Sequence, residues 1–407
     1  MKTTLWNRAP QRVLAIETDG LLLRAAVFSV LGNHDPVMEA CEESRELELP
    51  VALAEALENL KKRSISLPTR AIVLTPRSLM SVLELPADPQ RPLEHQKMRE
   101  LVRWELEPFI QENANSRSLS AILVGRGYLS ADNVELIIRD AALGKSAGKS
   151  GRFGEVAVEL GLISQAQLNE AISIQRLSQD EVVDDVVCGW SPLAPAGEGR
   201  WRWLACGASR SLRDDLRRTF RAQGLNLEAL YPIVGCAAAA LNGSAPRDAT
   251  VLEFHAGLVG CTRLVQGKVI SNRVSQIKRE GVTAKTCADL IVGEPDSVFV
   301  AGRTAHCEPI VGALPEWFGR PCEMISVNGA HSAEKVCLAG MAGAARHALG
   351  LPGGERTAAI PATDPVVPFV DRPLFWSAAI ASIVIAVAAT FEFKVAQHLK
   401  AEQQYRD

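Results

Sequence analysis

A stretch near the middle of the chain is written twice, and this duplication constrains the fold more than any other feature. The copies cover residues 118–141 and 152–175, at a constant offset that aligns Gly127 with Gly161. Self-similarity at a fixed offset means that one supersecondary unit is used twice, with each copy burying what the other exposes. The sequence therefore predicts a small duplicated module, which we place at residues 113–180.

Each copy of the duplicated stretch predicts a short helix, a glycine turn and a longer helix. Ser164 followed by Gln167 is a capping box for the longer helix of the second copy, and Ser130 can cap the same helix of the first copy. Apolar residues then recur on one face of each longer helix. We therefore expect a helical module with a packed core of its own.

The pattern of this module resembles the MshE N-terminal domain, a family found in ATPases of type II secretion and MSHA pili. Members of that family bind cyclic di-GMP across the two copies, so the resemblance implies such a site here. The positions that match the family pattern and would form it are Leu119, Gly127, Arg152, Gly154, Gly161 and Gln175. The first copy has Ser118, Ser120 and Ala141 where the pattern has Arg, Gly and Gln. Arginine is a planar, permanently charged partner for guanine or phosphate, so this loss favours the alternative of a purely structural module.

Composition narrows the class of protein. A chain of 407 residues predicts two or three domains. A net charge of −3 and an aromatic content of 5% argue against nucleic-acid binding. The nine cysteines are odd in number and form no Cys-x-x-Cys pair, which indicates neither a metal site nor a disulfide framework. We therefore expect no metal, and a main body that lies in the reducing cytoplasm.

The chain on either side of the module predicts alternating strands and helices. Residues 12–16 and 21–30 form a hairpin around an Asp-Gly turn, and residues 250–274 form a meander with a turn at 266–267. Further strands are predicted at 71–75, 78–85, 201–206, 298–300 and 322–325. Helices are predicted at 47–62, 94–109, 211–223, 229–241, 305–318 and 334–349. Two halves that each begin with a hairpin and an acidic residue at a strand end indicate a duplicated nucleotide-binding fold.

Four stretches make a family resemblance specific. Residues 15–24 resemble the first phosphate strand of actin-like proteins, residues 251–257 the second, and residues 300–304 the adenosine loop. Residues 101–110 are similar to a stretch typical of the PilM family of pilus assembly proteins. The order of segments also resembles the GspL and MshI families of type II secretion and MSHA pili. The implied fold is α/β, an actin-like (ribonuclease H-like) duplicated fold, whose lobes at 1–112 and 181–350 are separated by the inserted module.

An actin-like phosphate site needs a carboxylate for water or Mg²⁺ and bare backbone N–H groups for phosphate. Here Glu17 and Glu253 replace Asp, while Asp19 and His255 stand where Gly is expected. The positions that the resemblance assigns to this site are Glu17, Asp19, Arg24, Glu253, His255, Gly257 and Gly302. An acidic side chain repels phosphate and leucines block its approach. We therefore predict a degraded nucleotide site without catalytic residues, although the two glutamates could hold Mg²⁺ through water.

Residues 374–391 carry no charge. At about 1.5 Å per residue this run approaches the roughly 30 Å hydrocarbon core of a bilayer, and Trp376 suits an interfacial anchor. A buried core helix is the alternative, but an alanine-rich, uncharged run so late in the sequence favours a single transmembrane helix. We expect a Pro-rich linker at 351–373 and a short juxtamembrane tail at 392–407.

The sequence thus predicts a cytoplasmic body that is anchored in the inner membrane by one pass. The family resemblance implies a scaffold of a type IV pilus or type II secretion assembly platform, which links an assembly ATPase to PilN/PilO-like membrane partners. On this hypothesis the protein is not an enzyme, and any cofactor would be ATP with Mg²⁺ or cyclic di-GMP. The alternative is an active ATP-binding or ATP-hydrolysing actin-like protein.

Overall fold

The computed structural model describes most of the chain in separate stretches. These are residues 11–18, 22–30, 34–46, 48–114, 119–146, 152–179, 185–241, 248–255, 258–276, 287–288, 290–291, 293–302, 311–316, 319–320, 322–329, 338–364 and 373–406. Contacts divide the chain into two units, Met1–Ala362 and Thr363–Asp407, and each is described by itself.

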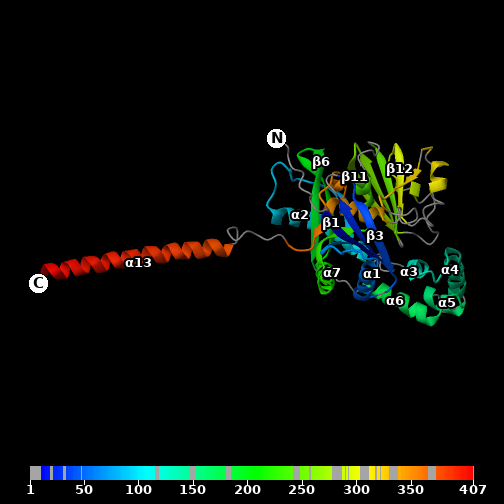
Figure 1. Cartoon of the computed structure of the whole chain (residues 1–407), viewed down its shortest axis with the longest axis horizontal. Coiled ribbons are helices and arrows are strands. Elements are labelled where there is room, and N and C mark those ends of the chain that lie inside the picture. Colours follow the sequence, from blue (N-terminus) through cyan, green and yellow to red (C-terminus); the bar gives the residue numbers. More distant parts are fainter. Residues whose placement is uncertain are drawn as a thin grey trace. The chain divides into compact units, whose positions relative to one another are not determined.

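The first sheet of the larger unit has six strands in the order β14-β8-β4-β1-β2-β3 (Figure 1). They are β1 (Gln11–Thr18), β2 (Leu23–Val30), β3 (Val37–Ser44), β4 (Arg70–Thr75), β8 (Asn226–Pro232) and β14 (Ile360–Pro361). Strands β1 to β3 form an antiparallel meander, whereas β4 and β8 run parallel to β1. Helix α1 (Leu49–Lys62) packs its apolar face against β2 and β3.

The second sheet repeats this arrangement with five strands in the order β11-β10-β9-β12-β13. They are β9 (Ala249–His255), β10 (Leu258–Val265), β11 (Lys268–Gln276), β12 (Ser297–Gly302) and β13 (Cys322–Met324). Again an antiparallel meander is followed by two parallel strands. The shared order of meander and parallel strands confirms the predicted duplicated α/β architecture.

A third, smaller sheet has the order β5-β7-β6. Its strands are β5 (Leu79–Leu85), β6 (Val186–Gly197) and β7 (Arg200–Ser209), and it is covered by helix α2 (His95–Ala114). Val102, Leu106 and Ile110 of α2 are buried in one apolar cluster with residues of all three strands. This sheet and helix lie directly before and after the duplicated module in the chain.

The duplicated module is helical, as predicted. It comprises α3 (Leu119–Gly125), α4 (Ala131–Ser146), α5 (Phe153–Glu159) and α6 (Gln165–Gln179), grouped at one end of the unit in Figure 1. The short helix of each copy packs against the long helix of the other, since α3 contacts α6 and α4 contacts α5. The capping box is present: the Ser164 N–H donates to Gln167 Oε1 at 2.8 Å, and the Gln167 N–H donates to Ser164 Oγ at 3.2 Å.

Further helical segments of the larger unit lie outside the duplicated module. They are α7 (Arg210–Ala222), α8 (Ala237–Ala240), α12 (Ala339–Ala348) and a 3₁₀ turn at Gly354–Arg356. Helices α8 and α12 are built from small residues and pack closely, because a Cβ on Gly343 would lie 1.8 Å from the Cys236 carbonyl oxygen. Of the predicted helix at 305–318, residues 311–316 are helical and the rest lies outside the described residues.

Several predicted elements were wrong. Helix α2 does not end at residue 109, as predicted, but continues through Pro108 to Ala114, because burial of Leu106 and Ile110 offsets the roughly 3 kcal/mol that an internal proline costs. The predicted helix at 229–241 is instead strand β8 followed by the one-turn helix α8. Small apolar residues suit a strand that lies between two neighbours as well as they suit a helix. Strands β3 and β6 were not predicted.

The predicted linker at 351–373 is folded in its first part. The 3₁₀ turn is followed by β14, where Ile360 pairs with Leu230, and the Ala362 N–H donates to the Glu228 carbonyl at 2.9 Å. Ile360 is fully buried, so this segment completes the edge of the first sheet rather than forming an extended tether.

The smaller unit contains one helix, α13 (Pro373–Arg406). Its segment Ile380–Lys400 has a mean hydropathy of 1.6 and is long and apolar enough to cross a membrane. In the part of the chain that the structure describes, it is the one helix that meets this test of length and composition. Residues 392–406, which belong to the predicted juxtamembrane tail, continue the same helix.

Candidate functional site

The first candidate residue, Glu17, lies near the end of β1 directly opposite Arg24 of β2. Arg24 Nη1 is 2.5 Å from Glu17 Oε1, and the two side chains are only 6% and 2% exposed. Arg24 Nε also donates to Glu43 Oε1 of β3 at 2.7 Å. A single buried guanidinium therefore compensates the carboxylate that the actin-like resemblance assigns to Mg²⁺ or water.

The second candidate carboxylate, Glu253, is fully buried in β9. It accepts hydrogen bonds from the backbone N–H of Gly235 and, at 2.8 Å, from that of Ala237. Gly235 lies in the turn between β8 and α8, with a φ of +104° that few residues other than glycine adopt, and Ala237 is the first residue of α8. Glu253 thus connects the second sheet to the loop that follows the first sheet.

The two carboxylates are close enough to influence each other. Burial raises the pKa of Glu253 to about 7, the N–H groups of Ala237 and Gly235 oppose this, and the charge of Glu17 adds to the increase. Cys236 lies in the same turn, and its thiol pKa is raised mainly by burial and further by both glutamates. The structure therefore brings Glu17, Arg24 and Glu253 together where the two halves of the fold meet.

Two further predicted residues lie at the same end of the second sheet. His255 ends β9 opposite Leu258, and Gly302 ends β12 opposite Phe254. Asp19 and Gly257 lie outside the described residues. The leucines predicted to block the first phosphate loop are packed into the protein where they are described, since Leu22 and Leu23 are 6% and 2% exposed.

The predicted residues of the duplicated module have packing and turn roles. A Cβ on Gly154 would lie 2.5 Å from Leu168 Cδ1 and 3.2 Å from Leu119 Cδ2. Gly127 and Gly161 have φ of +74° and +67° with open space around them, as turn glycines do.

Of the two polar members of this predicted set, Arg152 projects into solvent. Its side chain is 84% exposed and approaches Glu155 at 3.7 Å, whereas Gln175 is half-buried. Packing and turn geometry thus account for the glycines of the pattern without a ligand, and the arginine is the member that is exposed enough to reach one.

Sequence reasoning missed two features of these sites. The first is the Gly235–Ala237 turn, whose N–H groups lie within the run predicted as helix. The second is a cluster that joins the two copies of the module: Arg126 Nη2 is 2.7 Å from Glu170 Oε1, and the Tyr128 hydroxyl donates to Glu170 Oε2 at 2.9 Å. A comparison of the two copies could not predict this cluster, because Arg126 of the first copy aligns with Leu160 of the second.

The described residues do not fit a metal-bound triphosphate. Glu17 is paired with Arg24, and the Glu253 carboxylate accepts hydrogen bonds from the N–H groups of Gly235 and Ala237. Among the residues that the structure describes, no group of three or more His, Cys, Asp or Glu side chains is placed to hold a metal ion.

No protein-family model matches the chain, and no curated protein matches its sequence. Solved structures do match. A PilM-PilN type IV pilus biogenesis complex has a TM-score of 0.50 at 14% identity, over 82% of this chain and 98% of that chain. A Bacteroides thetaiotaomicron protein with an actin-like ATPase fold has 0.40 at 8%, over 82% and 95%. The cytoplasmic domain of EpsL, from the type II secretion system of Vibrio cholerae, has 0.35 at 9%, over 71% and 82%. With the duplicated sheets, the first of these likenesses establishes an actin-like fold.

Proposed function

We propose that this protein is a membrane-anchored scaffold of a type IV pilus or type II secretion assembly platform, and that it does not hydrolyse ATP. The observation that carries the proposal is the state of the two acidic positions at the junction of the lobes. Each has an internal partner: Arg24 for Glu17, and the N–H groups of Gly235 and Ala237 for Glu253.

Energetics support an inert junction. A buried carboxylate that loses its ionic partner is left as an uncompensated charge, which typically costs about 3–5 kcal/mol. To recruit Glu17 for Mg²⁺, or to free the turn amides for phosphate, the protein would have to break these contacts. A ligand would therefore compete with bonds that already stabilise the fold.

The anchor and the partners follow from the fold and the terminal helix. The 21-residue segment Ile380–Lys400 provides one bilayer crossing. Because a structure of similar fold is a complex of PilM with PilN, we propose that this body binds PilN/PilO-like inner-membrane proteins and connects them to an assembly ATPase. The body would then lie in the cytoplasm.

Titration calorimetry of the full chain in detergent micelles with Mg-ATP tests the scaffold role. We expect no binding heat and no phosphate release. Steady ATP turnover that is lost in Glu17→Gln would overturn the proposal and establish the alternative, an actin-like ATPase.

A second candidate function is the binding of cyclic di-GMP by the duplicated module, which its resemblance to the MshE N-terminal domain implies. The observation that favours it is the 84% exposed Arg152 at the start of the second copy. If the ligand binds, Arg152→Ala should abolish binding while Arg139→Ala, at another exposed arginine of the module, should not. Absence of binding at high micromolar ligand would leave the module with a structural role only.

A further inference from the structure

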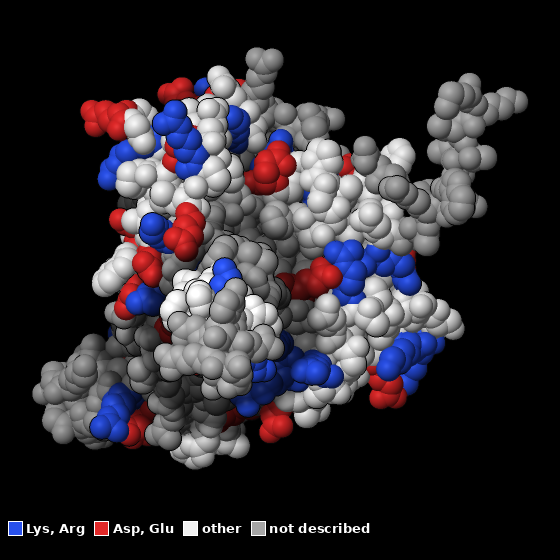
Figure 2. Space-filling model, turned by 90° about the vertical axis from the view of Figure 1, so that its left-hand side faces the viewer, with Lys and Arg blue, Asp and Glu red and all other residues white. Residues whose placement is uncertain are grey.

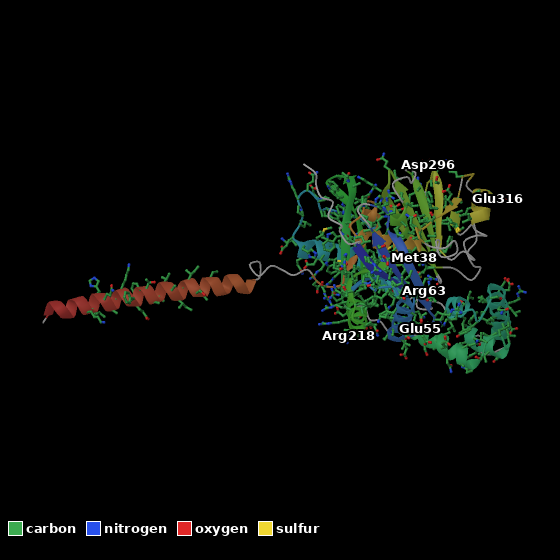
Figure 3. All side chains as sticks on the ribbon, in the orientation of Figure 1. Met38, Glu55, Arg63, Arg218, Asp296 and Glu316 are labelled. Atoms are coloured by element: carbon green, nitrogen blue, oxygen red, sulfur yellow. The ribbon has the colours of Figure 1, made fainter. Side chains whose placement is uncertain are left out.

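The C-terminal ends of α1 and α7 carry a set of exposed basic side chains. We call this surface the basic edge, and its members are Lys61, Lys62, Arg63, Arg217, Arg218 and Arg221. The two helices contact each other, and Figure 3 labels Arg63 just after α1 and Arg218 on α7. Figure 2 views the molecule from the left-hand side of Figure 1 and shows Lys and Arg side chains on the lower part of that face.

Half of the basic side chains of the basic edge have no acidic partner among the described residues. Within the described part of the chain, Lys61, Arg217 and Arg221 make no ion pair. Lys62 pairs with Glu58, Arg63 with Glu42 and Arg218 with Asp215. The side chains of Lys62, Arg63 and Arg218 are 59–80% exposed, and ion pairs of such exposed side chains contribute little to stability. Basic residues in a last turn interact favourably with the helix dipole.

The chain leaves the body at the same edge. Helix α1 leads into β4 and α7 leads into β8, and the first residues of these parallel strands, Arg70 and Asn226, are in register. Pro361 of β14 pairs with Ala229, and the Ala362 N–H donates to the Glu228 carbonyl. The last residues of the body therefore lie beside the start of β8, which is the end of the sheet that both basic helix termini approach.

The position of Glu17 indicates which end of the sheet this is. Glu17 lies near the end of β1, which is parallel to β4 and β8. Glu253 contacts the turn after β8. The two carboxylates thus lie at the C-terminal ends of the parallel strands, whereas the chain leaves the body at the N-terminal ends of these strands.

A short connection limits the distance between the basic edge, where the chain leaves the body, and the terminal helix. Residues 363–372 join the body to α13, which begins at Pro373. Ten residues (372 − 363 + 1) span at most about 35 Å even when fully extended. If α13 crosses the bilayer, the short connection keeps the basic edge near the membrane surface, where the effective concentration of lipid headgroups is high.

We propose that the basic edge docks on anionic phospholipid headgroups and orients the body, with the Glu17–Glu253 end facing away from the bilayer. The inference rests on the proposed membrane anchor. Charge complementarity identifies the occupant, because clustered Lys and Arg beside a membrane span are attracted to anionic lipid, and each removed cation should weaken the contact about five-fold.

Hydrogen exchange of the full chain in vesicles tests the proposal. The chain is reconstituted into phosphatidylcholine alone or into an equal mixture with phosphatidylglycerol. We expect amides of residues 61–69 and 217–225 to exchange more slowly in the anionic vesicles at low salt, and the difference to vanish at high salt. The variant Arg217→Glu with Arg221→Glu should lose this difference. The matched control is Arg200→Glu with Arg273→Glu, two exposed arginines on β7 and β11 that make no ion pair in the described part of the chain and should keep it.

Two negative results can be told apart. If a carbonate wash removes the chain from vesicles, the anchor is wrong, and the docking proposal fails with the proposed function. If the chain resists the wash but exchanges equally in both vesicle types, the docking proposal alone is overturned. Loss of the lipid-dependent difference in the control variant would also overturn it, because the effect would then follow net charge rather than this edge.

Discussion

Glu17 and Glu253 occupy equivalent places in the two halves of the fold, each near the end of the first strand of a meander, yet they are compensated differently. Glu17 faces the guanidinium of Arg24, whereas Glu253 faces the backbone N–H groups of Gly235 and Ala237. The first contact lies within one sheet and the second joins the two halves. The two halves therefore keep an acidic residue at a duplicated position and compensate it by different groups.

The largest expected effect comes from removing the cation of the first half. Arg24→Met leaves Glu17 buried without its ionic partner, so we expect the free energy of unfolding to fall by about 3–5 kcal/mol. Denaturant unfolding of the full chain in detergent, followed by circular dichroism, measures it. Arg12→Met is the matched control, because its pair with Glu39 bridges the same meander with side chains 22% and 28% exposed, and it should cost under about 1 kcal/mol. Equal effects of the two changes would show that Arg24 does not have the special role assigned to it.

The second half should respond less to loss of its carboxylate. Glu253→Ala leaves two buried N–H groups without an acceptor but leaves no charge behind, so we expect a loss of about 2–4 kcal/mol. Glu253→Gln keeps one carbonyl acceptor and should lose roughly half as much. The same denaturation measurement checks both variants. A larger loss for Gln than for Ala would contradict the assigned hydrogen bonds.

The pH dependence of stability sharpens the comparison further. Burial raises the pKa of Glu253 from 4.5 to about 7, so between these values the folded protein binds a proton that the unfolded chain has released. Stability should therefore fall as pH rises from 4.5 to 7, by at most about 1.4 kcal/mol per pH unit. Thermal unfolding across this range should show a flatter profile for Glu253→Gln than for the parent chain. Identical profiles would mean that Glu253 does not titrate there.

The features that the sequence predicts well are set by neighbouring residues. The meander turn at Gln266 and Gly267 has φ of +51° and +74°, as a two-residue hairpin requires. The capping box at Ser164 likewise involves a residue only three positions away.

The features that were missed depend on distant partners. Glu253 meets N–H groups 16 and 18 residues away in a stretch that has helical composition. β14 pairs with a strand about 130 residues earlier (360 − 230). Pattern and propensity contain no information about such encounters, so the duplicated fold could be predicted while the N–H partners of Glu253 could not.

The duplicated module allows a direct test of how its two copies differ, and the effect expected there is the smallest. Arg126 of the first copy pairs with Glu170 of the second, while the equivalent of Arg126 is Leu160. Arg126→Leu makes the copies alike and removes an ion pair with side chains 11% and 26% exposed, so we expect a loss of about 1 kcal/mol. Arg139→Leu is the control, since its pair with Glu135 is 70% and 74% exposed and should contribute almost nothing. Hydrogen exchange of α3 and α6 reports the change locally: faster exchange in Arg126→Leu alone would show that the divergent residue holds the copies together, and equal exchange in both variants would show that apolar packing alone does so.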